Sequence, residues 1–276
     1  MKEITFENIA STLATLVDKT LRSVEDSTVA LMQKALEVED GENSRWALSS
    51  IIKNAEIAKR DNCFACQDCG LALVFVALGR EVKLTCSLEE AINEGIRRGY
   101  KDARKSCAHP LTRKNTNDNT PAIIYTDIVE GDTIEISYLA KGAGSENMSK
   151  LYMLTPSKGR EGIIESIVDC VKEAGANPCP PIIIGVGIGG TMDKAALLSK
   201  RALLRETGKN SIDPIVAALE NDILQRVNQT GIGAQGLGGR TTALAVMVET
   251  FPTHIGMLPV AVTIQCHSVR HGKITL

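Results

Sequence analysis

The stretch DNCFACQDCG, Asp61 to Gly70, leads directly into the apolar run LALVFVAL, Leu71 to Leu78. A run this short and continuous is typical of a strand that is buried on both faces. In the stretch before it, Cys63, Cys66 and Cys69 follow the spacing C-x-x-C-x-x-C. Thiolates at this density suit zinc or an iron–sulfur cluster. We therefore expect a metal-binding turn at the start of a buried strand.

Two polar residues, Gln67 and Asp68, lie between the last two of these cysteines. The amide of Gln67 can form hydrogen bonds, and the carboxylate of Asp68 can accept or donate a proton. A purely structural zinc site has no need of a carboxylate beside its ligand, whereas a metal that acts on a substrate does. This arrangement favours a catalytic metal centre.

The composition restricts the class of protein. The chain has 276 residues, of which 43% are hydrophobic and only 3% aromatic, so we expect an aliphatic core. A net charge of -2 argues against a nucleic-acid-binding protein. The longest apolar runs are far shorter than a bilayer span, and the N-terminus MKEITFENIA lacks the apolar stretch of a signal peptide. We expect a cytoplasmic protein without membrane contact, whose eight cysteines are metal ligands or buried thiols.

Hydrophobic periodicity predicts an α/β fold with mixed sheets flanked by helices and a helical N-terminal region at 1–60. Within that region we expect helices over 4–21 and 27–39 and a third that Ser44 caps. A β-hairpin is expected over 122–139, with its turn at Glu130-Gly131-Asp132. Further helices are expected over 87–100, 161–174, from about 193 and over 212–228, and strands over 182–186, 242–249 and 259–265. Because no linker is evident, residues 1–276 are expected to form a single domain.

Two segments are candidate ligand-binding loops. Residues 104–121 are rich in Asn, Asp and Thr and offer no core face. Long loops of this kind in compact domains are often functional, and a solvated surface loop is the alternative. The segment KGAGSEN, residues 141–147, has glycines that let backbone N–H groups approach an anion.

Gly185, Gly187 and Gly190 match the pattern G-x-G-x-x-G between an expected strand and an expected helix. A dinucleotide site also needs a second strand that ends in an acid. The chain after Glu206 is polar and leads into another helix instead. Tight packing of the strand against the helix is therefore the favoured interpretation.

The residues alone leave three interpretations of the cysteines open. The run 63–69 could bind an electron-transfer cluster, but it lacks a fourth cysteine followed by proline. A structural zinc site would need a second ligand pair, for which Cys179 and Cys266 are both isolated. The third interpretation takes one cysteine from each of three turns, Cys66, Cys179 and Cys266, because each lies where a loop meets a strand.

Six segments together resemble the iron–sulfur (class I) fumarate hydratases, specifically the α subunit of the two-subunit form, with the L-tartrate dehydratase α subunit as a near neighbour. The segments are CQDCG, RKNTNDNTPA, AKGAGSENMS, NPCPPIIIGVGIGG, GLGGRTTALAV and PTHIGMLPVAVTIQCHSVRH, and they run from about Cys66 to Arg270. The resemblance implies a hydro-lyase that reversibly hydrates fumarate to L-malate, a reaction of the tricarboxylic acid cycle. Dehydration of L-tartrate is the alternative activity.

The resemblance also implies the site residues and the cofactor. In that family three cysteines hold a [4Fe-4S] cluster whose fourth iron is open to substrate, and these match Cys66, Cys179 and Cys266. The remaining matches are the candidate catalytic residues Asp68 and His254 and the candidate substrate-binding residues Gln67, Arg104, Gly142 and Gly144.

The chain departs from the family pattern in two ways. The usual C-Q-D-T-G has threonine where this chain has Cys69, and Cys63 is additional. The family's separate C-terminal region, with further arginines, a lysine and a catalytic threonine, has no counterpart here. The resemblance therefore implies a β subunit that completes the site around a dicarboxylate substrate in a hetero-oligomer, docking at an apolar patch around the cluster. Arg240 and Arg270 are additional candidates for that site, or each pairs with a surface acid.

Overall fold

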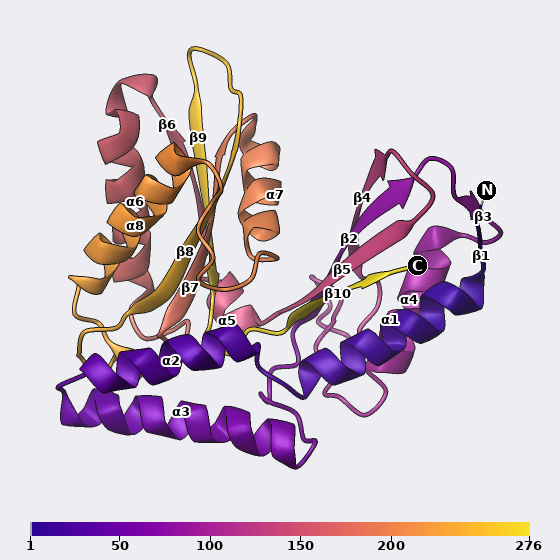
Figure 1. Cartoon of the computed structure of the whole chain (residues 1–276), viewed down its shortest axis with the longest axis horizontal. Coiled ribbons are helices and arrows are strands. Elements are labelled where there is room, and N and C mark those ends of the chain that lie inside the picture. Colours follow the sequence, from indigo (N-terminus) through magenta and orange to yellow (C-terminus); the bar gives the residue numbers. More distant parts are fainter. Residues whose placement is uncertain (1) are drawn as a thin grey trace. The chain divides into compact units, whose positions relative to one another are not determined.

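The computed structural model describes residues 2–276, which divide into two compact units (Figure 1). Unit 1 comprises the chain up to Val24, Ile57–Ala143 and Arg270–Leu276, and unit 2 comprises Glu25–Glu56 and Gly144–Val269. The chain therefore passes from unit 1 to unit 2 inside the KGAGSEN segment and returns shortly after Cys266. No helix among residues 2–276 is both long enough and apolar enough to cross a membrane.

Unit 1 is built on a four-stranded mixed sheet in the order β10-β5-β2-β4. The central strand β2 is parallel to β4 and antiparallel to β5. Its run of buried residues from 72 to 76 confirms the strand expected after the cysteine stretch. The strands are β2 (Leu71–Gly79), β4 (Ile123–Val129), β5 (Ile134–Lys141) and β10 (His271–Thr275), and a separate parallel pair joins β1 (Glu3–Ile4) to β3 (Lys83–Leu84).

The expected hairpin over 122–139 is wrong. Although β4 and β5 are consecutive in the chain, β2 lies between them in the sheet. In the sequence, Ile134, Ile136 and Tyr138 alternate with more polar residues, and this alternation correctly indicates the buried face of β5, because all three side chains are fully buried. Such a pattern identifies a buried face but not a strand's neighbours, and a strand that is apolar on both faces competes best for the centre of a sheet.

Helices α1 (Phe6–Leu21) and α4 (Leu88–Gly99) pack against each other in unit 1. The approach is close, since a Cβ added to Gly99 would lie 2.6 Å from Cβ of Val17. Ser87 caps α4 by accepting a hydrogen bond from the backbone N–H of Glu90 at 3.3 Å.

Unit 2 contains a second four-stranded mixed sheet, in the order β6-β9-β7-β8, where β7 is parallel to β8 and antiparallel to β9. Helices α6 and α8 cover one face and α7 covers the other (Figure 1). The core is aliphatic, as expected, and includes the buried Cys170 on α6. The elements are β6 (Lys150–Leu154), α6 (Gly159–Ala174), β7 (Ile182–Gly189), α7 (Met192–Ala202), α8 (Pro214–Asn228), β8 (Ala243–Phe251) and β9 (Leu258–Gln265), with the short turns α5 (Ala143–Glu146), η1 (Pro156–Lys158) and η2 (Ala234–Gly236).

Helices α2 (Asp26–Val38) and α3 (Glu42–Arg60) make up the rest of the helical N-terminal region. Because α3 begins at Glu42, Ser44 lies inside its first turn, and the expected cap at Ser44 is wrong. The Ser44 hydroxyl instead donates to the carbonyl oxygen of Gly238. Glu39, which is 2% exposed, accepts the backbone N–H of Arg240 at 2.9 Å. These contacts hold the glycine-rich segment 231–240 within unit 2.

The glycines of β7 allow α7 to pack directly on the strand. A Cβ on Gly185 would lie 2.2 Å from the carbonyl oxygen of Ser199, and one on Gly187 would lie 2.0 Å from that of Ala195. The packing interpretation of the G-x-G-x-x-G match is confirmed. With α/β architecture, mixed sheets and flanking helices, the expected fold class is confirmed as well.

Candidate active site

The turn after Cys66 holds the carboxylate of Asp68 through backbone groups. Oδ1 accepts the N–H of Gly70 at 2.9 Å, and Oδ2 accepts the N–H of Ala143 at 2.8 Å. Gly142 lies alongside, because a Cβ placed there would be 3.2 Å from Oδ2. Unit 1 thus brings Asp68 together with Gly142 of the glycine-rich segment, and the carboxylate remains half-buried rather than sealed in the core. Gln67, beside Cys66, is exposed.

Buried polar side chains lie beneath this turn. Arg270 is 1% exposed, and its Nη1 donates to the carbonyl oxygen of Asp68 at 2.6 Å. The Tyr100 hydroxyl donates to the carbonyl oxygen of Cys69 at 3.0 Å and is 2.7 Å from the hydroxyl of Tyr138. Burial raises the pKa of both tyrosines, so both hydroxyls keep their protons. Of the two roles that the sequence offered for Arg270, a cation of the substrate site or a partner of a surface acid, the second does not suit a side chain that is 1% exposed.

Cys69 is a buried connection between the turn and the loop that carries Arg104. The side chain is 2% exposed, and burial raises the pKa of its thiol. Its Sγ lies 3.9 Å from the carbonyl oxygen of Cys66, and the backbone of Arg104 hydrogen-bonds to the sulfur. Cys69 therefore joins the turn to the Arg104 loop from within the core.

The loop over 104–121 contains no helix or strand and is fixed from inside by Asn119. Asn119 is fully buried; its Oδ1 accepts the backbone N–H groups of Ser106 at 2.5 Å and Cys107 at 3.0 Å. Its Nδ2 donates to the carbonyl oxygen of Arg104 at 3.2 Å. The backbone of Arg104 is thereby held while its side chain is exposed, which suits a guanidinium that binds a carboxylate.

In unit 2, Cys179 and Cys266 lie at the same end of the sheet. Cys179 precedes β7 and Cys266 follows β9, and these antiparallel strands place Ile183 opposite Gln265. Nδ1 of His267 is 3.0 Å from the carbonyl oxygen of Cys179. Cys179 is exposed and has φ +56, a backbone region that residues other than glycine seldom adopt. Two of the three predicted ligands are thus brought together.

Glycine-rich segments border the Cys179 turn. Both the backbone N–H and the side-chain amide of Gln235 donate to the carbonyl oxygen of Pro180 at 2.8 Å. A Cβ on Gly144 would be 3.6 Å from the carbonyl oxygen of Asn177. The ion pair between Glu146 and Lys200 ties the segment that contains Gly144 to α7. Within unit 2, the predicted residue Gly144 therefore lies beside the turn that carries Cys179.

His254 lies at the other end of the same sheet. It is exposed in the loop from β8 to β9, and its Nδ1 accepts the backbone N–H of Gly256 at 3.0 Å. It borders a cavity of about 500 Å³ lined largely by aliphatic side chains, including the highly exposed Ile215 and Ile255. Within unit 2, the fold therefore does not bring His254 to Cys179 or Cys266, and this apolar surface also lies away from the two cysteines.

The chemistry of the cysteines suits a cluster held by Cys66, Cys179 and Cys266. Across residues 2–276, no three His, Cys, Asp or Glu side chains are grouped as a metal site. Cys66 belongs to unit 1, whereas Cys179 and Cys266 belong to unit 2. All three lie in turns outside the hydrophobic cores. Cys170 is core instead, and burial raises the pKa of its thiol to about 11. Three accessible cysteine thiolates fit the [4Fe-4S] cluster that the resemblance implies.

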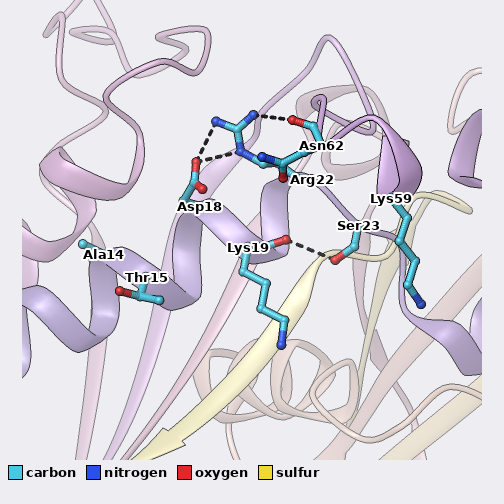
Figure 2. A pocket seen from close by; sticks show the side chains of 8 residues that line it. All are labelled: Ala14, Thr15, Asp18, Lys19, Arg22, Ser23, Lys59 and Asn62. Atoms are coloured by element: carbon cyan, nitrogen blue, oxygen red, sulfur yellow. Dashed lines mark hydrogen bonds and ion pairs between the residues drawn. The ribbon is translucent and has the colours of Figure 1, made fainter. Parts of the chain in front are cut away.

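A pocket that the sequence does not predict lies beside α1 in unit 1 (Figure 2). It has a volume of about 560 Å³ and is bordered by Lys19, Arg22 and Lys59. The guanidinium of Arg22 donates to Asp18 at 2.9 Å and to the carbonyl oxygen of Asn62 at 2.8 Å. The guanidinium carbon Cζ of Arg22 also lies 4.3 Å from the ring centroid of Phe64. Arg22 therefore fixes the start of the cysteine stretch against α1.

Comparison with known proteins identifies the family. A model of the fumarate hydratase (fumerase) family matches residues 10–275. The chain belongs to the fumarate hydratase family. It is 42% identical over 250 residues to the putative L(+)-tartrate dehydratase subunit alpha of Methanocaldococcus jannaschii, covering 87% of this chain and 88% of that protein. It is 28% identical over 255 residues to the L(+)-tartrate dehydratase subunit alpha of Escherichia coli K12, covering 90% and 84%.

Membership of the fumarate hydratase family confirms the resemblance that the six segments carry. It also makes this chain an enzyme of the lyase class, as expected. An electron-transfer function and a purely structural function of the chain accordingly lose their support.

Proposed function

We propose that this chain is the α subunit of an iron–sulfur hydro-lyase that reversibly hydrates fumarate to L-malate. The observation that carries the proposal is the placement of Asp68: its carboxylate is fixed by two backbone N–H groups, two residues after the candidate ligand Cys66. A proton on the carbon beside a carboxylate is weakly acidic, so its removal needs a positioned base. Asp68 is a positioned base next to a candidate metal ligand.

The proposed cofactor is a [4Fe-4S] cluster held by Cys66, Cys179 and Cys266. Such a cluster supplies a Lewis acid for the hydroxyl group, which is otherwise a poor leaving group. This chain's own residues bind the substrate and move the proton. Asp68 takes the proton from carbon during dehydration and returns it during hydration.

Substrate carboxylates are bound by groups that the fold leaves accessible. The exposed guanidinium of Arg104 can pair with one carboxylate. The amide of Gln67 and the backbone N–H groups around Gly142 and Gly144 orient the substrate by hydrogen bonds. His254 is assigned to the same site through the family resemblance, although unit 2 places it away from Cys179 and Cys266.

A partner β subunit completes the site. A buried dianion normally requires opposing cations, and Arg104 supplies one. The two relatives are both named as α subunits, which supports a second chain. We therefore propose a cytoplasmic hetero-oligomer in which residues 1–276 act as one catalytic domain and the partner brings further cations.

L(+)-Tartrate is the second candidate substrate, and the names of the two relatives favour it. Tartrate carries one hydroxyl more than malate but offers the same two carboxylates and the same leaving group. The residues described here suit either dicarboxylate.

The deciding experiment is anaerobic reconstitution with iron and sulfide, with and without the β chain, followed by parallel assays. Hydration of fumarate, dehydration of L-malate and dehydration of L-tartrate would be compared by kcat/KM. We expect the chain alone to bind a cluster but to be inactive, and the complex to be active. A cluster-loaded complex that converts none of the three compounds would contradict the proposal, as would stoichiometric zinc in place of iron.

A further inference from the structure

Three consecutive carbonyl groups of the Cys66–Gly70 turn, those of residues 68 to 70, face buried side chains. These side chains come from distant parts of unit 1. The carbonyl oxygen of Asp68 accepts from Arg270 at 2.6 Å. Those of Cys69 and Gly70 both accept from the Tyr100 hydroxyl, at 3.0 Å and 3.4 Å. Arg270 stands just before β10 and Tyr100 directly after α4. Elements far apart in sequence thus converge on one face of the turn.

The direction of these carbonyls determines the direction of the Asp68 carboxylate. Peptide groups are planar, so carbonyls fixed toward the core restrict the orientation of the N–H groups that follow them. One of these, the N–H of Gly70, is the donor that holds Oδ1 of Asp68. The turn also lies directly against β5, since a Cβ on Gly70 would be 2.9 Å from the backbone nitrogen of Lys141 and a side chain would not fit there.

Arg270 places a charged guanidinium in the core beneath the Asp68 turn. A buried guanidinium costs desolvation free energy that a neutral amide or hydroxyl would avoid. The residue is also anchored by its backbone, since the N–H of Ala140 donates to its carbonyl oxygen at 2.9 Å. A Cβ on Gly142 would be 3.2 Å from Oδ2 of Asp68 and 3.9 Å from Nη2 of Arg270. The carboxylate of Asp68 and the guanidinium of Arg270 therefore both lie beside Gly142.

We propose that Arg270 is a positioning residue for Asp68, acting with Tyr100 to fix the turn so that the carboxylate is presented in a single orientation. The proposal rests on the proposed function only in taking Asp68 as the acid–base group. Arg270 does not contact substrate; it acts through the backbone of Asp68. Its loss should therefore lower turnover while leaving the residues that bind substrate in place.

The first test is independent of activity. Amide hydrogen exchange by mass spectrometry, on the full chain, reports on the peptides that contain Gly70 and Ala143, whose N–H groups are held by Asp68. Arg270→Gln should speed exchange in both peptides by about tenfold or more, since a tenfold change corresponds to about 1.4 kcal/mol of lost protection. Tyr100→Phe should have a smaller effect in the same peptides.

Arg205 provides the matched control, because it is a partly buried arginine in unit 2 that pairs with the buried Glu220. Arg205→Gln should lower the melting temperature but leave exchange at Gly70 and Ala143 unchanged. If Arg270→Gln yields no folded protein, Arg270→Lys takes its place, since it keeps the charge and loses the planar guanidinium. Normal exchange at both amides in the folded Arg270 variant would overturn the proposal.

The second test measures turnover in the reconstituted complex, per bound cluster. Arg270→Gln should lower kcat by about 10-fold to 10²-fold, the usual cost of a misplaced catalytic group, with KM changed less than threefold. Arg205→Gln should keep wild-type kcat. An equal loss of kcat in both variants would reduce Arg270 to a general stability role and overturn the proposal. If the wild-type complex converts no dicarboxylate, the proposed function fails, while the exchange experiment still decides whether Arg270 positions Asp68.

Discussion

Two of the three turns that carry candidate cluster ligands, those of Cys66 and Cys179, are held in different ways. In unit 1, the Cys66–Gly70 turn is supported by buried charged and phenolic side chains, Arg270 and Tyr100. In unit 2, the Cys179 turn lies between Pro178 and Pro180, and the groups that reach it are the amides of Gln235 and the ring of His267. Only the first turn also presents a carboxylate.

The difference follows from what each turn has to hold. A carboxylate that transfers a proton must meet the substrate within a narrow range of distances and angles, so its backbone needs a rigid and costly support. A thiolate ligand needs mainly to be accessible and aimed at the metal, which stiff proline and glycine turns achieve without charge. Substitutions that test this contrast should therefore affect proton transfer and cluster binding separately.

The largest effect is expected from removing a ligand in either unit. Cys66→Ser and Cys179→Ser should each lose the cluster, because three thiolates are proposed to hold it. Iron and sulfide content and the visible absorbance after anaerobic reconstitution measure this, and hydro-lyase activity of the complex should be abolished. Cys170→Ser is the control, since Cys170 is fully buried in the unit 2 core. A Cys66→Ser protein with a full cluster would remove unit 1 from the ligand set.

The next effect separates chemistry from cluster binding. Asp68→Asn keeps the shape of the side chain but removes the basic carboxylate, and its single amide oxygen can accept only one of the two backbone N–H groups that now hold Asp68. The cluster should be retained, and kcat should fall by about 10²-fold or more, as expected for loss of a general acid–base group. The control is Asp61→Asn, because Asp61 pairs with Arg60 on the surface at the start of the same stretch. Near-normal turnover of Asp68→Asn with a full cluster would exclude Asp68 from proton transfer.

The third effect is on stability in unit 2, where the Cys179 turn continues into β7. Gly187→Ala would place a Cβ 2.0 Å from the carbonyl oxygen of Ala195, so α7 would have to move. We expect a loss of about 1–3 kcal/mol in the free energy of unfolding, the usual range for overpacking. Denaturant unfolding measures it, with Gly41→Ala as control, since a Cβ there meets no atom closer than 3.5 Å. Stabilisation of the wild-type chain by a dinucleotide would contradict the structural role of these glycines.

Local patterns predicted the elements of this fold better than their partners. The apolar run of β2 and the periodicity of α1 were sufficient to place both, and the buried face of β5 followed from alternation. Strands β6 and β10 were missed because neither contains a fully buried residue, which leaves no clear pattern to read. The order of the unit 1 sheet was mispredicted because neighbours in a sheet are set by packing of the whole layer rather than by adjacency in the chain.

The candidate site shows the same division. Asp68 stands out in sequence because it lies within a run of closely spaced cysteines, Cys63, Cys66 and Cys69. Arg270, which lies 202 residues from Asp68, carried no local signal of burial and resembled any other arginine near a chain end. Side chains that support a turn from beneath are recruited by the tertiary fold, so only the structure could identify them.

The smallest effect concerns Cys69, where the family's usual motif has threonine. Its buried thiol lies between the carbonyl oxygen of Cys66 and the backbone of Arg104, and burial raises its pKa. A threonine hydroxyl can accept from the Arg104 backbone and donate to the Cys66 carbonyl in the same place. Cys69→Thr should therefore keep cluster content and kcat within about twofold of wild type, a difference of less than about 0.5 kcal/mol.

Cys69→Val is the sharper comparison, because valine matches threonine in shape but has no hydroxyl. It would leave the Arg104 backbone group unsatisfied in the core, which costs about 1–3 kcal/mol. Denaturant unfolding should show this loss for Cys69→Val and not for Cys69→Thr, while Cys63→Ser, at an exposed position, should change neither stability nor iron content. If the Cys69→Thr protein loses iron from the cluster, Cys69 is a ligand, and the Cys66–Gly70 turn would bind the metal through two cysteines.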